Sequence, residues 1–193
     1  PVAFTFLFIA VAVASFTLAK PIRQGLFLKE FGAYKLAYAY VAVPVVLAAF
    51  VPLYQWVASR VGQRLVFSGS LLFLCANAVA FWWGFTFHRR PWLAAAFYVW
   101  VNCYGVIAPV QAWTFANAVF DTRQARRLFG VVGSGASFGA IVGGLLAQSL
   151  VGLLGTVNLL LVLAAMIASA ALVVNLAWRV RRRDPRPITR RRA

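Results

Sequence analysis

Acidic side chains are almost missing from this sequence of 193 residues. There are three, Glu30, Asp121 and Asp184, beside a single histidine and two cysteines. This scarcity leaves no carboxylate pair for acid–base catalysis, no cluster of metal ligands and no histidine next to a nucleophile. The sequence therefore predicts that the protein is not an enzyme and that it binds no metal or other cofactor.

The two cysteines and the histidine do not combine into a site either. Cys75 and Cys103 fall inside apolar runs, and His88 stands alone in a predicted loop. None of them has a partner at metal-ligand spacing. We expect both thiols to be buried as small hydrophobic side chains.

Charge of either sign is also scarce, and this excludes a soluble domain. Charged residues make up 11% of the chain and apolar residues 63%, whereas soluble domains carry about 25% charged residues. Lipid can solvate so much apolar surface, and a membrane-spanning helix needs about 20 apolar residues. The apolar runs cover residues 2–19 with a continuation at 24–28, 36–59, 65–87, 91–120, 128–154 and 157–180.

These runs predict an all-α membrane protein of six transmembrane helices. Residues 1–180 would form the bundle, and residues 181–193 a basic cytoplasmic tail or the start of a central loop. No room is left for a separate soluble domain. Because the chain begins with Pro1, we expect its start to be trimmed or missing. The first run lacks a basic leader and a cleavage site, so we expect no cleavable signal peptide.

Basic residues are plentiful and unevenly placed, giving a net charge of +16. Thirteen lie in alternate gaps and in the tail, whereas four lie in the other gaps. Because cytoplasmic loops are enriched in Lys and Arg, this bias places both termini in the cytoplasm of a bacterial inner membrane. Clustering in the tail (Arg179–Arg183) favours contact with anionic lipid headgroups over binding of nucleic acid.

Glycine is concentrated in the fifth predicted helix. Gly135, Gly139 and Gly143 form two overlapping steps of small residues four apart. Such steps allow helix backbones to approach closely in lipid. We interpret them as helix packing; a smooth contact that lets helices slide during a transport cycle is the alternative.

Lys20 and Arg23 interrupt the first apolar run and are the sharpest sign of function. Residues three apart lie on one side of a helix, and Glu30 joins them if the helix continues. In one interpretation the helix ends near Ala19 and these side chains reach an interface. In the other the helix is longer, and they face an aqueous cavity and attract an anionic substrate.

The fourth predicted helix supplies the other buried polar groups, Asn102, Gln111 and Asn117. Asn102 and Asn117 lie about 60° apart on a helix of 3.6 residues per turn, and Gln111 points nearly opposite to Asn102. A shared polar face indicates either an interior cavity or hydrogen bonds between helices.

Two short elements resemble a known family. Lys20-Pro21-Ile22-Arg23 resembles the basic-Pro-x-Arg element of the bacterial relatives of the ATP:ADP antiporters. Residues 113–117 (Trp-Thr-Phe-Ala-Asn) and 121–130 (Asp-Thr-Arg-Gln-Ala-Arg-Arg-Leu-Phe-Gly) look like the element between that family's helices four and five. The loop at 59–64 resembles the signature of the wider major facilitator superfamily, with Ser59 in place of an aspartate.

The resemblance implies the N-terminal six-helix half of a twelve-helix transporter. It would move an anionic solute by alternating access, with ATP exchanged for ADP as the family's activity. Lys20, Arg23 and Asn117 would match substrate-binding residues of the family, and a second six-helix half would complete the protein. Asn102, which shares a helix face with Asn117, is a further candidate for substrate binding. The alternatives are transport of another polar solute, or a membrane scaffold that no longer transports.

Overall fold

The computed structural model describes residues 2–88, 90–119 and 122–183, without the side chains of residues 2, 63–65, 116–119, 122–129, 131–132 and 177–183. The described residues form long helices joined by short turns, and none of them lies in a strand. The helices are α1 (Val2–Phe31), α2 (Leu36–Arg60), α3 (Gln63–Phe87), α4 (Pro91–Val119) and α5 (Thr122–Arg183). The predicted all-α class is confirmed.

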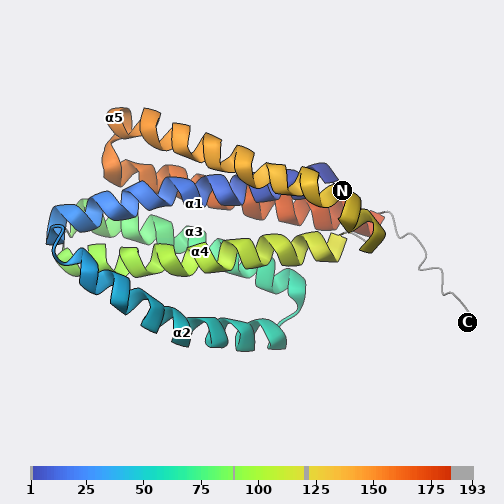
Figure 1. Cartoon of the computed structure of the whole chain (residues 1–193), viewed down its shortest axis with the longest axis horizontal. Coiled ribbons are helices and arrows are strands. Elements are labelled where there is room, and N and C mark those ends of the chain that lie inside the picture. Colours follow the sequence, from blue (N-terminus) through green and yellow to red (C-terminus); the bar gives the residue numbers. More distant parts are fainter. Residues whose placement is uncertain (1, 89, 120–121, 184–193) are drawn as a thin grey trace, which may run out of the picture.

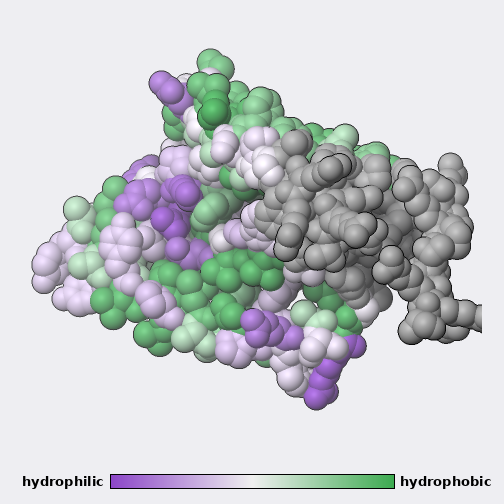
Figure 2. All heavy atoms as spheres, turned by 45° about the vertical axis from the view of Figure 1, so that its right-hand side comes forward, coloured by the Kyte–Doolittle hydropathy of each residue, from purple (hydrophilic) through white to green (hydrophobic). Residues whose placement is uncertain are grey.

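Five helices are long and apolar enough to cross a membrane, which marks the chain as a multi-pass membrane protein. The predicted count of six is not confirmed, because residues 128–180, predicted as two helices, belong to the single kinked element α5. Figure 2 shows the outer surface: hydrophobic residues cover broad areas of it, and hydrophilic residues gather in patches.

Gly155 divides α5, which is 62 residues long. Its φ of 74° and ψ of 162° are not helical, so two helices meet at a kink at this residue. In Figure 1 the orange and red parts of α5 run back alongside each other from this point. The kink falls in the gap predicted between residues 154 and 157. The second part continues to Arg183, three residues beyond the predicted bundle, and residues 184–193 of the predicted tail lie outside the described residues.

The first helix continues through Pro21 instead of ending near Ala19. It runs unbroken to Phe31 and ends where Gly32 adopts a left-handed φ of 72°. The Gly32 N–H donates to the Leu28 carbonyl at 2.9 Å, and this arrangement is a common glycine cap at a helix C-terminus. Lys20 and Arg23 are therefore interior residues of a 30-residue helix, as the second interpretation of the sequence required.

The glycine ladder of α5 packs against the backbone of α1. The facing pairs are Phe6 with Gly135, Ala10 with Gly139, and Ala14 with Gly143. A Cβ atom on Gly139 would lie 2.9 Å from Ala10 Cα, closer than packed atoms come. Because both series advance in the same direction, α1 and this part of α5 are parallel (Figure 1). The predicted close approach of helices at these glycines is confirmed.

Side-chain hydrogen bonds join α3 to the second part of α5. Their donors lie seven residues apart on α3, on one face of the helix. The pairs are Ser68 with Asn175 at 3.0 Å, Cys75 with the Ala164 carbonyl at 3.4 Å, and Trp82 with Asn158 at 3.1 Å. Such bonds hold helices together where lipid offers no hydrophobic driving force. Both cysteines are free and only half-buried, so they are less enclosed than we expected.

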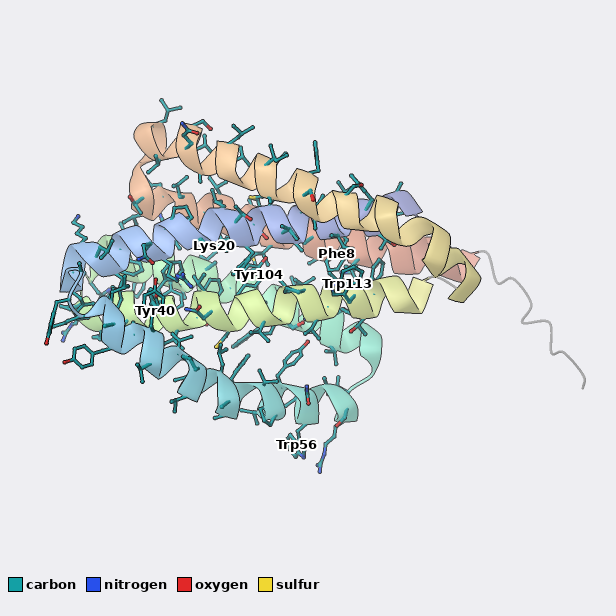
Figure 3. All side chains as sticks on the ribbon, in the orientation of Figure 1. Phe8, Lys20, Tyr40, Trp56, Tyr104 and Trp113 are labelled. Atoms are coloured by element: carbon teal, nitrogen blue, oxygen red, sulfur yellow. The ribbon has the colours of Figure 1, made fainter. Side chains whose placement is uncertain are left out.

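The second helix leans away from the others (Figure 1). Val43 is its one buried residue in the described part of the chain. Trp56 is 53% exposed and points outward in Figure 3. Several further apolar side chains of α2 are exposed: Val41, Val45, Val46, Leu53 and Val57. In a membrane protein, such a face contacts lipid or another helix bundle.

Candidate functional site

One stripe of α1 runs along α4 and contains both Lys20 and Arg23. Its members, Phe16, Lys20, Arg23 and Phe27, follow the spacing of four, three and four residues that keeps side chains on one side of a helix. Phe16 packs edge-on against Tyr104, and Phe27 lies 4.8 Å from the Tyr98 ring centroid. The α1–α4 seam therefore has aromatic contacts above and below the two cations.

Arg23 is held firmly by α4. Its Nη1 donates to Asn102 Oδ1 at 2.8 Å, and its guanidinium carbon lies 4.5 Å from the centre of the Tyr98 ring. Asn102 Nδ2 in turn donates to the Tyr98 carbonyl at 2.7 Å, which aims the amide oxygen at the arginine. Stacking on an aromatic face and a directed hydrogen bond both suit the planar guanidinium.

The guanidinium keeps an unused donor. Arg23 Nε is buried and has no hydrogen-bond partner among the described residues. An unpaired charged donor inside a protein is costly. Arg23 is thus positioned by Asn102 and Tyr98 but is not fully satisfied by them, so a bound anion or water would complete its hydrogen bonding.

Lys20 lies one turn earlier and has a different environment. Its side chain is exposed, and Nζ lies 4.7 Å from the centre of the Phe16 ring. Figure 3 shows Lys20 and Tyr104 along the α1–α4 seam, partway between the ends of the bundle. Lys20 also lines a hollow between α1 and α5, which contains Gln148 of α5. The two cations share a helix face, as predicted, but Arg23 is tethered to α4 and Lys20 is free to reach a ligand.

Neither cation has a carboxylate partner in the part of the chain that the structure describes. Glu30 lies on the same α1 stripe but is exposed near the helix end, and no ion pair joins it to Arg23. A charge at the centre of a transmembrane helix costs about 2.5–3.5 kcal/mol in insertion measurements. Two uncompensated positive charges in one apolar helix therefore need water or an anion.

The predicted polar residues of α4, Asn102, Gln111 and Asn117, do not share one environment. Asn102 faces α1, whereas Gln111 is buried on the opposite side, as its position nine residues later predicted. Gln111 Nε2 donates to Tyr54 Oη at 3.1 Å and to the Ser70 hydroxyl, so it links α4 to α2 and α3. Asn117, the fourth predicted site residue, belongs to α4, but its side chain lies outside the described ones.

Sequence reasoning missed a second polar contact in the α1–α4 seam. Ser15 and Tyr104 are both buried, and their hydroxyl oxygens are 2.5 Å apart. Because the Ser15 hydroxyl donates to the Ala12 carbonyl at 2.9 Å, Tyr104 is the donor to Ser15. The available signal was a serine within an apolar run, five residues before Lys20. This bond ties the two helices together one turn from the cations.

No metal site is apparent among the described residues, which contain no group of three or more His, Cys, Asp or Glu side chains placed to hold an ion. Comparison with protein families, with curated proteins and with solved structures finds no match for this chain. The seam therefore offers two cations, Arg23 held by α4 and Lys20 exposed, with aromatic and amide neighbours.

Proposed function

We propose that this protein is the N-terminal six-helix half of a major-facilitator-type carrier that moves an anionic solute across the membrane. The observation that carries the proposal is the pair of cations, Lys20 and Arg23, on one face of a continuous apolar helix and without carboxylate partners among the described residues. A carrier that alternates between two open states needs such a site near the middle of the membrane. Binding of an anion there would offset the cost of placing two positive charges in an apolar helix.

Six membrane crossings follow if α5 counts as two spans. Its apolar stretch, Gly133–Leu176, has 44 residues. At 1.5 Å per residue a straight helix of this length would extend about 66 Å, roughly twice the hydrocarbon thickness. The kink at Gly155 divides the stretch into two parts of about spanning length, and this supports the count of six.

The arrangement of the helix ends supports an inner-membrane topology with both termini in the cytoplasm. In Figure 1 the N-terminus, the α2–α3 connection and the start of α5 lie at one end of the bundle. Among the described residues, the helix ends and the connection at this end carry nine basic residues, whereas those at the other end carry three. Enrichment in Lys and Arg is typical of cytoplasmic loops.

Nucleotide exchange, ATP against ADP, is the form of this proposal that the family resemblance favours. Transport of a different anionic or polar solute is the alternative. A non-transporting scaffold is the second candidate function, and the exposed apolar face of α2 favours it, since another membrane protein could pack there. In a carrier, a second six-helix half would contact the bundle instead.

The test is uptake by the full-length protein in liposomes. Labelled ATP, ADP, phosphate and small carboxylates are offered to the parent and to folded Lys20→Gln and Arg23→Gln variants. Lys29→Gln is the matched control, because Lys29 is an exposed cation at the end of α1, away from the seam. A charge-assisted hydrogen bond contributes about 1.5–3 kcal/mol, so each site variant should weaken binding roughly ten- to a hundredfold.

Equal uptake of every anion by the parent and both site variants would show that these cations are interfacial anchors. Failure of the parent to transport any solute, in the presence of its second half, would favour the scaffold.

A further inference from the structure

A hollow of about 590 Å³ lies between α1 and α5 near the kink at Gly155. Four of its lining residues carry hydrogen-bonding side chains: Thr17 and Lys20 from α1, and Gln148 and Thr156 from α5. Lys20 is the only charged residue among those that line it. The volume lies within the range of about 300–1,000 Å³ typical of small-molecule sites.

The Gln148 and Lys20 side chains of this hollow are exposed, and they differ in their hydrogen bonding from polar residues beside them. Ser149, the neighbour of Gln148, donates to the Leu145 carbonyl at 2.7 Å within its own helix. Asn158 Nδ2 likewise donates to the Leu154 carbonyl at 3.0 Å. Gln148 and Lys20 make no side-chain hydrogen bond to any described residue. Because lipid cannot supply hydrogen bonds, these groups are available to water or to a ligand.

Two glycines keep the hollow open. A Cβ atom on Gly144 would meet nothing within 4 Å, and one on Gly25 would touch only a methyl group of Thr156, at 3.8 Å. The adjacent Gly143, by contrast, packs tightly against Ala14 of α1. The spacing that packs Gly139 and Gly143 against α1 therefore leaves Gly144 facing open space beside Lys20.

We infer that this hollow binds a small anion of low charge that also carries hydroxyl groups, such as a hydroxycarboxylate, and that Gln148 determines its specificity. This inference rests on the proposed transport function and identifies the class of substrate. One flexible ammonium group faces three neutral hydrogen-bonding side chains there, a set that matches one carboxylate and several hydroxyls. Arg23 does not line the hollow, since Asn102 and Tyr98 hold its guanidinium on the α4 side. In this inference Lys20 alone supplies the charge to the substrate, and Arg23 acts by holding α1 against α4.

A polyphosphate fits this lining poorly. Phosphate groups are bound by clusters of cations and backbone N–H donors that neutralise several charges. The hollow presents a single cation, Lys20, against the several negative charges of a polyphosphate. This favours the alternative of a small polar anion over a nucleotide.

The test uses the full-length protein in liposomes with labelled gluconate as the probe and unlabelled lactate or ATP as competitor. The parent should take up gluconate in a manner that depends on Lys20, and ATP should compete poorly. Loss of one neutral hydrogen bond in Gln148→Leu should reduce gluconate affinity roughly two- to tenfold. Gln148→Glu, of the same size but negatively charged, should reduce it further. Gln55→Leu on the exposed face of α2 is the matched control and should leave uptake unchanged.

A second variant tests the hollow without removing a polar group. Gly144→Leu should fill the space beside Lys20 and abolish uptake in a protein that still folds, because leucine is a better helix former than glycine. Gly144→Ala, which adds a single methyl group, should retain most of the activity.

The outcomes separate this inference from the proposed function. Lys20-dependent uptake that Gln148→Leu and Gly144→Leu leave unchanged would overturn the hollow as the site while anion transport stands. Efficient competition by ATP would overturn the low-charge substrate class alone. If no anion is taken up in a Lys20-dependent way, both the proposed function and this inference fail.

Discussion

The Arg23 side chain is half-buried, and it keeps one hydrogen-bond donor, Nε, without a partner among the described residues. Asn102 fixes its position through one hydrogen bond, and the Tyr98 ring supports the face of the guanidinium. Lys20, three residues earlier, is exposed and has only an aromatic contact with Phe16. We therefore expect the two cations to respond differently to substitution, although both carry one positive charge.

Exchange of the two cation types should show this difference. Lys20→Arg should retain uptake, since the hollow leaves room for a larger cation. Arg23→Lys should lose it roughly tenfold or more, because a point charge cannot both stack on Tyr98 and donate to Asn102 in the same plane. Initial uptake rates in liposomes at matched protein amounts measure both effects. Normal uptake by Arg23→Lys would show that only the charge at position 23 matters.

Asn102 should matter for stability as well as for the site. Asn102→Ala leaves the Arg23 Nη1 donor unpaired, at a cost of about 1–3 kcal/mol or more for a charged group. Thermal unfolding in detergent should show a lower midpoint than the parent. Asn77→Ala is the control, because Asn77 bonds only to the Phe73 carbonyl of its own helix. Equal midpoints for the two variants would argue against the Arg23–Asn102 contact.

At the scale of single elements, the sequence predicted the helices better than the contacts between them. Hydropathy located the ends of α2, α3 and α4 to within two residues, but it placed the start of α5 at 128 instead of Thr122. The glycine ladder indicated which face of α5 packs closely. The continuity of α1 through Pro21 could not be decided, because proline lacks only one helical hydrogen bond and its neighbours compensate for the loss in membrane helices.

Contacts between helices could not be predicted from spacing alone. Arg23 and Asn102 lie 79 residues apart in the sequence, and their hydrogen bond depends on how α1 and α4 pack. Ser15 with Tyr104, and Gln148 facing the hollow of Lys20, went unnoticed for the same reason. Gln111 was recognised as a polar residue opposite Asn102, but its bonds to Tyr54 and Ser70 required knowledge of the neighbouring helices.

The close packing of Gly135, Gly139 and Gly143 against α1 can be tested by substitution. Gly139→Leu would push α5 away from the Ala10 backbone and should sharply lower the yield of folded protein and its thermal stability in detergent. Gly152→Leu on the same helix is the control, since a side chain there meets nothing within 4 Å. If both variants remain as stable as the parent, the parallel packing of α1 against α5 is incorrect.

For the whole molecule, the proposed transport function depends on one proposed feature, the six-crossing topology. In that topology the α1–α4 seam would lie inside the membrane, and the kink at Gly155 would be a turn at the membrane surface. The more basic end and the less basic end of the bundle would then lie on opposite sides of the membrane.

Labelling of single cysteines in intact cells tests this topology most directly. Gln63→Cys, Gln124→Cys, Ala33→Cys and Leu153→Cys are each introduced after Cys75 and Cys103 have been replaced by alanine. Leu153 is suited to labelling because it is 81% exposed beside the kink. The account predicts that Ala33→Cys and Leu153→Cys react with a membrane-impermeant reagent from outside. Gln63→Cys and Gln124→Cys should react only after the membrane is opened. Labelling of Gln124→Cys from outside, or protection of Leu153→Cys together with Gln63→Cys, would contradict it.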